Sequence, residues 1–318
     1  MAGRVFILFF LILALNLLSV GCSSNYRQDQ SYLSDLGGVY SSSEKDLDLS
    51  IEVSGRLSES TSSITDAGIE DILVNSGNGV LDGKLLRWGI SRRENNQTPA
   101  ADPGAPQLLA KYGGAYIGDT SQKTVYLTFD EGYENGYTPK ILDVLRDNGV
   151  KAIFFITGPY LKDHQDLVRR MVEEGHEVGN HTIHHPSLPE LDDSRMEEEV
   201  LGLDRAFHEK FGQHMRFLRP PKGEYSEKSL ALTSKLGYCN LFWSFAYDDW
   251  YRDRIRGAGY AYNIVMRNLH NGAVLLLHAV SKDNAEALDS IIKGIQEKGY
   301  AIGSPEELLQ LPKAEGED

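Results

Sequence analysis

The chain has 318 residues and a formal net charge of −14, which is enough length for one large domain with appendages or for two modest domains. Such an acidic protein has little surface that could neutralise phosphate groups, and this argues against nucleic-acid binding. There are two cysteines, Cys22 and Cys239. If Cys22 is modified, Cys239 has no partner for a disulfide, and we predict it to be a small buried residue instead of a catalytic thiol.

Residues 1–21 are predicted to be a signal peptide. Arg4 precedes an uncharged apolar run from Val5 to Val20, which is short for a membrane span and stops at small residues. Cys22 follows directly after a glycine, and this ending resembles the lipobox of bacterial lipoproteins, in which the cysteine carries lipid and becomes the mature N-terminus. We therefore predict export, with the protein anchored to the outer face of the cell membrane. The alternatives are an ordinary signal peptide or an uncleaved anchor, with Cys22 incidental.

Residues 22–85 are predicted to be a tether. Between residues 26 and 80 the chain carries ten acidic and three basic residues, so half of the net charge lies in this segment. The segment is also rich in serine, as in the runs SSSEKD and SESTSS, and such a composition buries little apolar surface. The remaining residues, 86–318, are expected to form the folded domain.

From about Lys123 onward, short apolar runs alternate with amphipathic helical stretches. The run TVYLTFD, for example, precedes TPKILDVLRDNG, which has Thr138 as the predicted N-cap, Pro139 at the first helical position and Gly149 as the stop. Seven such units predict an α/β fold of parallel strands covered by helices, either an open doubly wound sheet or a barrel. The predicted strands lie near residues 124–130, 151–158, 176–182, 215–221, 239–246, 272–280 and 300–304.

Polar side chains follow the ends of four different predicted strands. They are Asp130, His181, Arg219 and His278. In both architectures the carboxyl ends of the strands meet at one rim, where the loops build a site, so we expect these four side chains to lie together. Taken alone, Arg219 could be half of a structural ion pair and His278 a packed core residue.

The segment GNHTIHHP contains His181, His184 and His185 between a glycine and a proline, which predicts a loop. Two neutral imidazoles and a carboxylate are the ligands that zinc and similar ions take in hydrolytic sites. A cluster of histidines that only form hydrogen bonds fits this segment equally well.

Asp130 and Glu131 are adjacent carboxylates at the end of an apolar run. Side chains alternate across a strand, so neighbours within one point to opposite faces. The two can therefore share a site only if the strand ends between them and Gly132 lets the chain turn.

Together, the segments TFDEG, HTIHHP, RPPKG, SFAYDDW and LLLH resemble, in order and spacing, the motifs of the polysaccharide deacetylases, the NodB-homology or carbohydrate esterase family 4 enzymes. The resemblance runs from about Trp88 to near Leu311. It implies a distorted (β/α)7 barrel and a hydrolase of carbon–nitrogen bonds other than peptide bonds, which removes N-acetyl groups from sugars. It also implies a divalent metal, zinc above all, with cobalt or manganese as alternatives.

Two longer segments, FDEGYENGYTPK and HAVSKDNAEAL, are similar to the subgroup that deacetylates muramic acid in peptidoglycan. In that subgroup the product leads to the muramic delta-lactam of the spore cortex. The resemblance also implies a role for each of eight residues: Asp130 as general base, Arg219 as its ion-pair partner, His278 as general acid, Glu131, His181 and His185 as metal ligands, Lys222 as donor of a backbone N–H to the oxyanion, and Trp250 as a wall of the sugar pocket.

Two positions depart from the family pattern. Glu131 stands where the wider family has a second Asp and the muramic-acid subgroup commonly has Asn, and its extra methylene moves the carboxylate oxygens. Ala246 aligns with the Asp that orients the acid histidine in many relatives. His278 would then need another partner, and Asp248 and Asp249 are near in sequence.

Three functional hypotheses follow. The first is a deacetylase of N-acetylmuramic acid lacking a stem peptide; the second is a catalytically impaired, glycan-binding lipoprotein on the same fold. The third is a deacetylase of peptidoglycan N-acetylglucosamine, chitin oligomers or O-acetylated polysaccharide. The expected partners are peptidoglycan glycan strands and, through the lipid, the membrane, whereas the sequence implies no protein partner.

Overall fold

The computed structural model describes residues 81–93 and 96–311. The predicted signal peptide, the predicted lipidation site Cys22 and the tether up to residue 80 lie outside the described residues, and the division of the chain at residues 21 and 85 stays a prediction. In the described part of the chain, no helix combines the length and apolar character that crossing a membrane requires.

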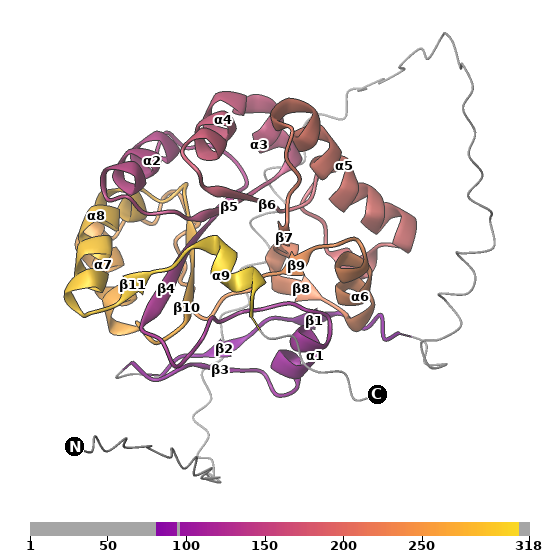
Figure 1. The fold of residues 1–318 in the computed structure, drawn as a ribbon, viewed down its shortest axis with the longest axis horizontal. Helices are drawn as coiled ribbons and strands as arrows, with labels where there is room; N and C mark the ends of the chain where they lie inside the picture. Colours follow the sequence, from indigo (N-terminus) through magenta and orange to yellow (C-terminus); the bar gives the residue numbers. More distant parts are fainter. Residues whose placement is uncertain (1–80, 94–95, 312–318) are drawn as a thin grey trace, which may run out of the picture. The chain divides into compact units, whose positions relative to one another are not determined.

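A parallel sheet of seven strands forms the centre of the fold (Figure 1). Its strands are paired in the order β10-β4-β5-β6-β7-β9, and β11 pairs with the start of β4. Each strand corresponds to one of the seven predicted strands. Their bounds are β4 (Thr124–Glu131), β5 (Ile153–Ile156), β6 (Glu177–Asn180), β7 (Phe217–Leu218), β9 (Cys239–Asn240), β10 (Ala273–His278) and β11 (Ala301–Ile302).

The sheet curls because the chain after β9 returns to β10. Phe245 forms an isolated parallel bridge with Leu275, and its carbonyl accepts a hydrogen bond from the N–H of Leu276 at 2.8 Å. This short contact takes the place of a full strand pair between the two ends of the sheet, which makes the barrel a distorted one.

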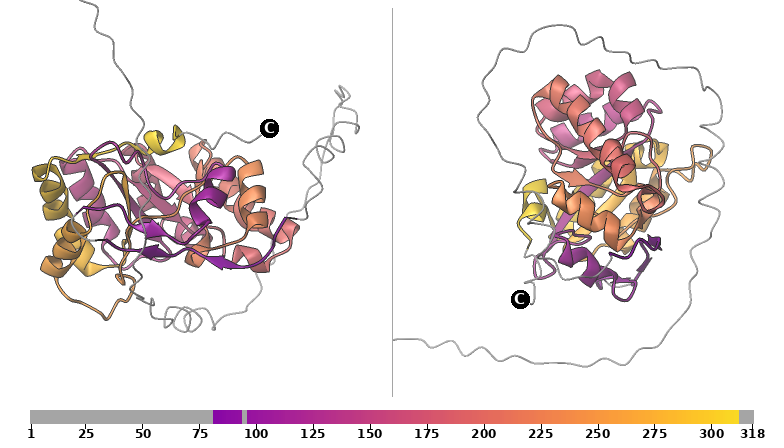
Figure 2. Two further views of the ribbon diagram at one scale, coloured as in Figure 1. Left: turned by 90° about the horizontal axis from the view of Figure 1, so that it is seen from below. Right: turned by 90° about the vertical axis from the view of Figure 1, so that its right-hand side faces the viewer.

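Helices surround the sheet, as Figure 1 shows. The helices that follow the strands are α2 (Thr138–Asp147), α3 (Gly158–Asp163), α4 (Gln165–Glu173), α5 (Asp193–Phe211), α6 (Glu227–Lys235), α7 (Ala258–Arg267), α8 (Lys282–Glu297) and α9 (Pro305–Leu309). The N-terminal segment (indigo) adds α1 (Ala105–Lys111) and three short strands, β1 (Leu86–Arg87), β2 (Ile90–Ser91) and β3 (Ala100–Ala101). It lies along the lower side of the barrel in Figure 1 and in the right-hand view of Figure 2. There β1 pairs antiparallel with β8 (Glu224–Tyr225).

The two faces of β4 have different environments, as strand alternation requires. Leu127 and Phe129 pack into the main apolar core beneath the helices, while Tyr126 belongs to a second buried cluster that fills the barrel interior. Thr128 and Asp130 share the interior face with Tyr126. The carboxyl end of β4 therefore delivers Asp130 to the inside of the barrel.

The start of α2 differs from the prediction that Thr138 is its N-cap. The helix begins at Thr138, and the side chain of Glu134 takes over the capping: its Oε1 accepts hydrogen bonds from the N–H groups of Tyr137 at 3.0 Å and Thr138 at 3.4 Å. A carboxylate at this end of a helix is also favoured by the helix dipole. The Thr138 hydroxyl is consequently free to donate to Glu131, at 3.4 Å.

Candidate active site

Asp130 and Arg219 form a buried ion pair at the interior rim of the barrel. Arg219 Nη1 donates to Asp130 Oδ1 at 2.6 Å, and the Arg219 side chain is inaccessible to solvent. Burial alone would raise the pKa of Asp130, but the charge and hydrogen bond of Arg219, together with the charges of His181 and His278, outweigh it and hold that pKa below its ordinary value. Asp130 is therefore an ionised carboxylate able to accept a proton.

The Arg219 guanidinium is held on every side. It donates to Thr128 Oγ1 at 2.8 Å and to the carbonyl of Leu241 at 3.1 Å, and it lies 4.1 Å from the ring centroid of Phe155. A guanidinium fixed in this way fixes its carboxylate partner as well. The ion pair thus stabilises the barrel interior and orients Asp130.

His278 lies at the end of β10, where its Cα is the strand-pairing partner of that of Asp130. Its Nδ1 is 2.7 Å from Asp249 Oδ1, and its backbone N–H donates to Asp249 Oδ2 at 2.8 Å. A carboxylate only accepts, so the proton of this contact belongs to Nδ1 and leaves Nε2 for a substrate. Burial would lower the pKa of His278, but the charge and hydrogen bond of Asp249 outweigh it and raise that pKa.

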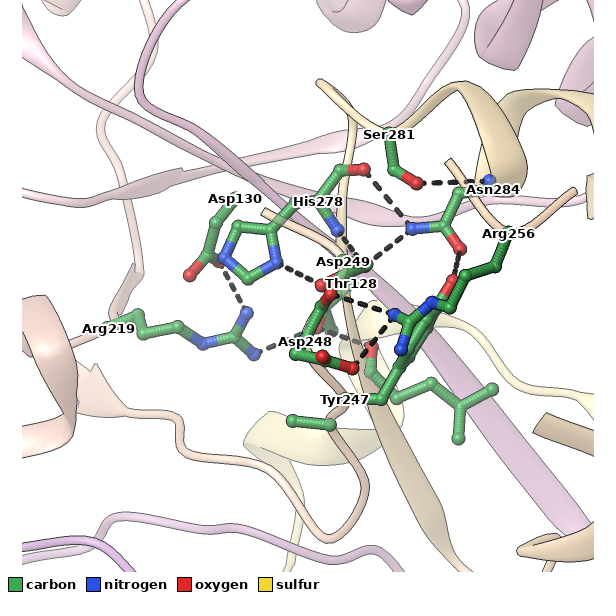
Figure 3. A network of polar contacts seen from close by, with 12 residues as sticks. Thr128, Asp130, Arg219, Tyr247, Asp248, Asp249, Arg256, His278, Ser281 and Asn284 are labelled. Atoms are coloured by element: carbon green, nitrogen blue, oxygen red, sulfur yellow. Dashed lines mark hydrogen bonds and ion pairs between the residues drawn. The ribbon is translucent and has the colours of Figure 1, made fainter. Parts of the chain in front are cut away.

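Asp249 thus provides the carboxylate partner of His278 that Ala246 cannot provide. Asp248, the other candidate, faces elsewhere and pairs with Arg254 and with Arg256 at 2.8 Å. Figure 3 shows the outcome: Asp130, with Arg219 behind it, and His278, with Asp249 behind it, lie side by side.

His181 and His185 meet in the loop after β6, next to the ion pair. The two Nε2 atoms are 3.1 Å apart, and His181 Nε2 is 3.6 Å from Asp130 Oδ2. His181 Nδ1 donates to the carbonyl of Arg219 at 2.8 Å, so its Nε2 carries a lone pair in the neutral ring. Burial lowers the pKa of both histidines, which favours neutral imidazoles.

The conformation of this loop depends on Asn180 and Glu199, two residues that the sequence did not single out. Thr182 and His185 have φ values of 67° and 59°, a region that non-glycine residues rarely adopt. Asn180 Oδ1 accepts from the N–H of Thr182 at 2.8 Å, and Glu199 binds both the N–H and the Nδ1 of His184, at 2.8 and 2.7 Å. Glu199 is one of three successive glutamates in a helical stretch, so nothing in the sequence distinguishes it.

Glu131 does not lie with the histidines. β4 continues through Glu131, which pairs with Ile156, so alternation keeps its side chain on the face opposite Asp130 and the turn at Gly132 comes one residue too late. Its Oε2 accepts from Thr138, while Oε1 is buried with no hydrogen-bond partner among the described residues. Burial, followed by the charge of Glu134, raises the pKa of Glu131 well above its ordinary value.

The predicted ligand set of Glu131, His181 and His185 is consequently not assembled. Within residues 81–93 and 96–311, no group of three or more His, Cys, Asp or Glu side chains is arranged to hold a metal ion. The two imidazoles fit a metal, whereas the buried carboxyl group of Glu131 accepts from Thr138 on the other face of β4 and does not join them.

Lys222 and Trp250 flank the site. Lys222 lies in the turn Pro221–Gly223 with a φ of 60°, and its charge adds to the lowering of the His185 pKa, of which burial is the first cause. The Trp250 ring meets the His278 ring edge-on, with centroids 5.7 Å apart. The structure thus places Trp250 against His278 and Lys222 within electrostatic reach of His185, and the roles assigned to both stay predictions.

Comparison with known proteins identifies the fold. The sequence profile of a family described as polysaccharide deacetylase matches residues 117–241. The peptidoglycan-N-acetylmuramic acid deacetylase PdaA of Bacillus subtilis is 44% identical over 225 residues, which are 70% of this chain and 86% of PdaA. The chain belongs to the polysaccharide deacetylase family. It is accordingly a hydrolase, and the resemblance seen in the sequence is confirmed.

Solved structures of carbohydrate esterase family 4 agree with this membership. That of Bacillus subtilis PdaA superposes with a TM-score of 0.71 at 42% identity and covers 72% of this chain and 99% of its own. That of a family 4 esterase from Bacillus anthracis has a TM-score of 0.62 at 42% identity, and it covers 73% of this chain and 99% of its own. The similarity confirms the predicted distorted (β/α)7 barrel of the deacetylases.

Proposed function

We propose that this deacetylase removes the N-acetyl group from N-acetylmuramic acid residues of peptidoglycan that lack a stem peptide. The observation that carries the proposal is the pair of dyads, Asp130 with Arg219 and His278 with Asp249, side by side at one rim. The substrate is suggested by the name of PdaA, to which 70% of the chain is similar. The hypothesis of an impaired enzyme rested on Glu131 and Ala246. The second ground is weakened because Asp249 orients His278 in place of a residue at position 246.

The two dyads account for the chemistry with the chain's own groups. A water molecule adds to the acetyl carbonyl carbon while Asp130 accepts its proton. The tetrahedral intermediate then collapses, and the carbon–nitrogen bond breaks as Nε2 of protonated His278 donates to the amine nitrogen, which is too basic to leave as an anion. The products are acetate and the free amino sugar. In the proposal, the backbone N–H of Lys222 stabilises the oxyanion and Trp250 walls the sugar pocket.

A divalent metal remains part of the proposal. Family 4 deacetylases are metalloenzymes in general. Zinc is proposed ahead of cobalt or manganese because neutral imidazoles are ligands that zinc prefers, and the Nε2 atoms of His181 and His185 lie 3.1 Å apart. Titration calorimetry of the full chain with each ion, beside the His181→Ala variant, tests this point, and equal heats for both proteins would contradict it.

Export, lipid on Cys22, the outer face of the membrane and a place in making the spore-cortex delta-lactam are likewise proposals, supported by sequence alone. The test is to express the full chain and its Cys22→Ala variant in a spore-forming bacterium. We expect the variant to leave the membrane fraction, and an unchanged distribution would argue against lipidation.

The substrate is tested by incubating the full-length protein with three glycans: muramyl strands without stem peptides, strands that keep them, and chitin oligomers. We expect acetate release from the first alone. Release from the chitin oligomers instead would move the specificity to N-acetylglucosamine, and no release from any glycan with any divalent ion would end the deacetylase proposal.

A further inference from the structure

Asn284 lies in the first turn of α8, close behind the dyad of His278 and Asp249, and is 1% exposed. Its Nδ2 donates to Asp249 Oδ2 at 2.5 Å and to the carbonyl of His278 at 3.2 Å. Asn284 therefore contacts both members of the dyad, one through its carboxylate and the other through its backbone (Figure 3).

Tyr247 fixes which way the Asn284 amide points. The Tyr247 hydroxyl is hydrogen-bonded to Asn284 Oδ1. Asp249 can only accept, so the amide must turn its NH₂ group to Asp249 and its oxygen to Tyr247, and the phenol must donate. Burial raises the pKa of Tyr247, so the hydroxyl keeps the proton that this contact needs.

The network joins an irregular segment to a regular one. Tyr247 and Asp249 lie in the stretch between β9 and α7, which forms neither helix nor extended strand, whereas Asn284 belongs to a helix of 16 residues. Ser281 caps that helix by accepting from the N–H of Asn284 at 3.3 Å. Without Asn284, the hydrogen bonds that the Asp249 carboxylate accepts from the described residues would all come from His278 itself, and the two could turn together.

We propose that Asn284, oriented by Tyr247, is a positioning residue for the general acid: it holds the Asp249 carboxylate and the His278 main chain so that Nε2 faces the scissile amide. Because the acid role of His278 belongs to the proposed function, this inference rests on it. A purely structural asparagine would also be buried and fully hydrogen-bonded, so the two roles must be separated by measurement.

The first measurement is steady-state acetate release from muramyl glycans by full-length Asn284→Ala and Tyr247→Phe variants. We expect kcat to fall about ten- to a hundredfold for Asn284→Ala, the range seen when the orienting partner of a functional group is lost, with KM within about twofold. Tyr247→Phe leaves the amide in place and removes one hydrogen bond, so we expect a smaller fall of about three- to tenfold.

Thr233→Val is the matched control. Thr233 on α6 is a buried hydroxyl bonded to the amide of a buried asparagine, Asn240, with distances of 3.0 and 2.9 Å, as Tyr247 is to Asn284. We expect it to lose comparable thermal stability and to keep its kcat. If Asn284→Ala keeps the kcat of the wild type, or loses no more than Thr233→Val, the positioning role is overturned.

A second measurement does not depend on turnover. In the wild-type protein, the His278 Nδ1 proton shared with Asp249 should give a low-field, slowly exchanging proton resonance. We expect Asn284→Ala to broaden it into exchange with water and Thr233→Val to leave it unchanged. If the wild type releases no acetate from any glycan, the proposed function fails by itself, and this resonance still decides the positioning role: its persistence in Asn284→Ala would overturn it.

Discussion

Asp130 and Glu131 are neighbours in the sequence, yet they lie on opposite faces of β4 in opposite electrostatic environments. Asp130 faces the barrel interior, where Arg219 binds one oxygen and lowers its pKa. Glu131 faces the helices, where one oxygen has no partner among the described residues and burial raises its pKa. One carboxyl group is held ionised for chemistry and the other is driven towards its neutral form. The counter-charge, and not the place in a motif, decides which carboxylate can act as a base.

The largest effect should come from Asp130→Asn, which removes the charge from the paired face. We expect kcat to fall by about 10³-fold, within the range that general bases contribute. Arg219 would also be left buried without a counter-charge, which costs about 3–5 kcal/mol of stability. Acetate release and urea unfolding measure the two effects, with turnover assayed where circular dichroism shows the variant folded. Activity within tenfold of the wild type would show that Asp130 is not the base.

Asp249→Asn removes the charge of the second paired carboxylate, and we expect a fall in kcat of about 10²-fold. The variant also tests the direction in which Asp249 shifts the pKa of His278. Asp249 raises the pKa of His278 above the ordinary 6.5, against the lowering by burial. The acid must be protonated, so the alkaline limb of the wild-type kcat profile should lie above pH 6.5 and should move down in the variant. A limb that stays in place would assign it to another group.

Much of this arrangement could be predicted from sequence because it depends on local pattern. Apolar runs and helix signals predicted the seven strands at their places along the chain, and the rule that functional groups gather at carboxyl ends brought Asp130, Arg219 and His278 together. The prediction that Glu131 joins His181 and His185 failed because β4 is one residue longer than it required. Had β4 ended at Asp130, Glu131 could have turned inward; the pairing of Glu131 with Ile156 prevents it. No local pattern reveals such a pairing.

Contacts between segments far apart in the chain could not be predicted from the sequence either. Asn284 is 35 residues from Asp249, and Glu199 is 15 residues from His184. Each is a polar residue in an amphipathic helical stretch, where polar residues are expected whether or not they have a function. Only the packing of α8 and α5 against the rim distinguishes these two from their neighbours.

The smallest effect on activity should come from Glu131→Gln, which replaces the carboxyl group on the helix-facing side of β4 by a neutral amide. Since the folded-state pKa of Glu131 is raised, the folded protein keeps a proton that the unfolded chain releases above about pH 4.5, so this group lowers stability as pH rises from that value towards the folded pKa. A neutral amide removes that dependence, and we expect the variant to be more stable than the wild type by about 1 kcal/mol at pH 8.

Three measurements should therefore agree for Glu131→Gln: kcat within about twofold of the wild type, unchanged heats of zinc binding, and a stability gain that grows between pH 5 and 8. The ligand role predicts the reverse, because an amide is a much poorer zinc ligand than a carboxylate. If Glu131→Gln lost both zinc binding and turnover, Glu131 would have to turn inward when metal is present. The two faces of β4 would then be less separate than their hydrogen bonds indicate.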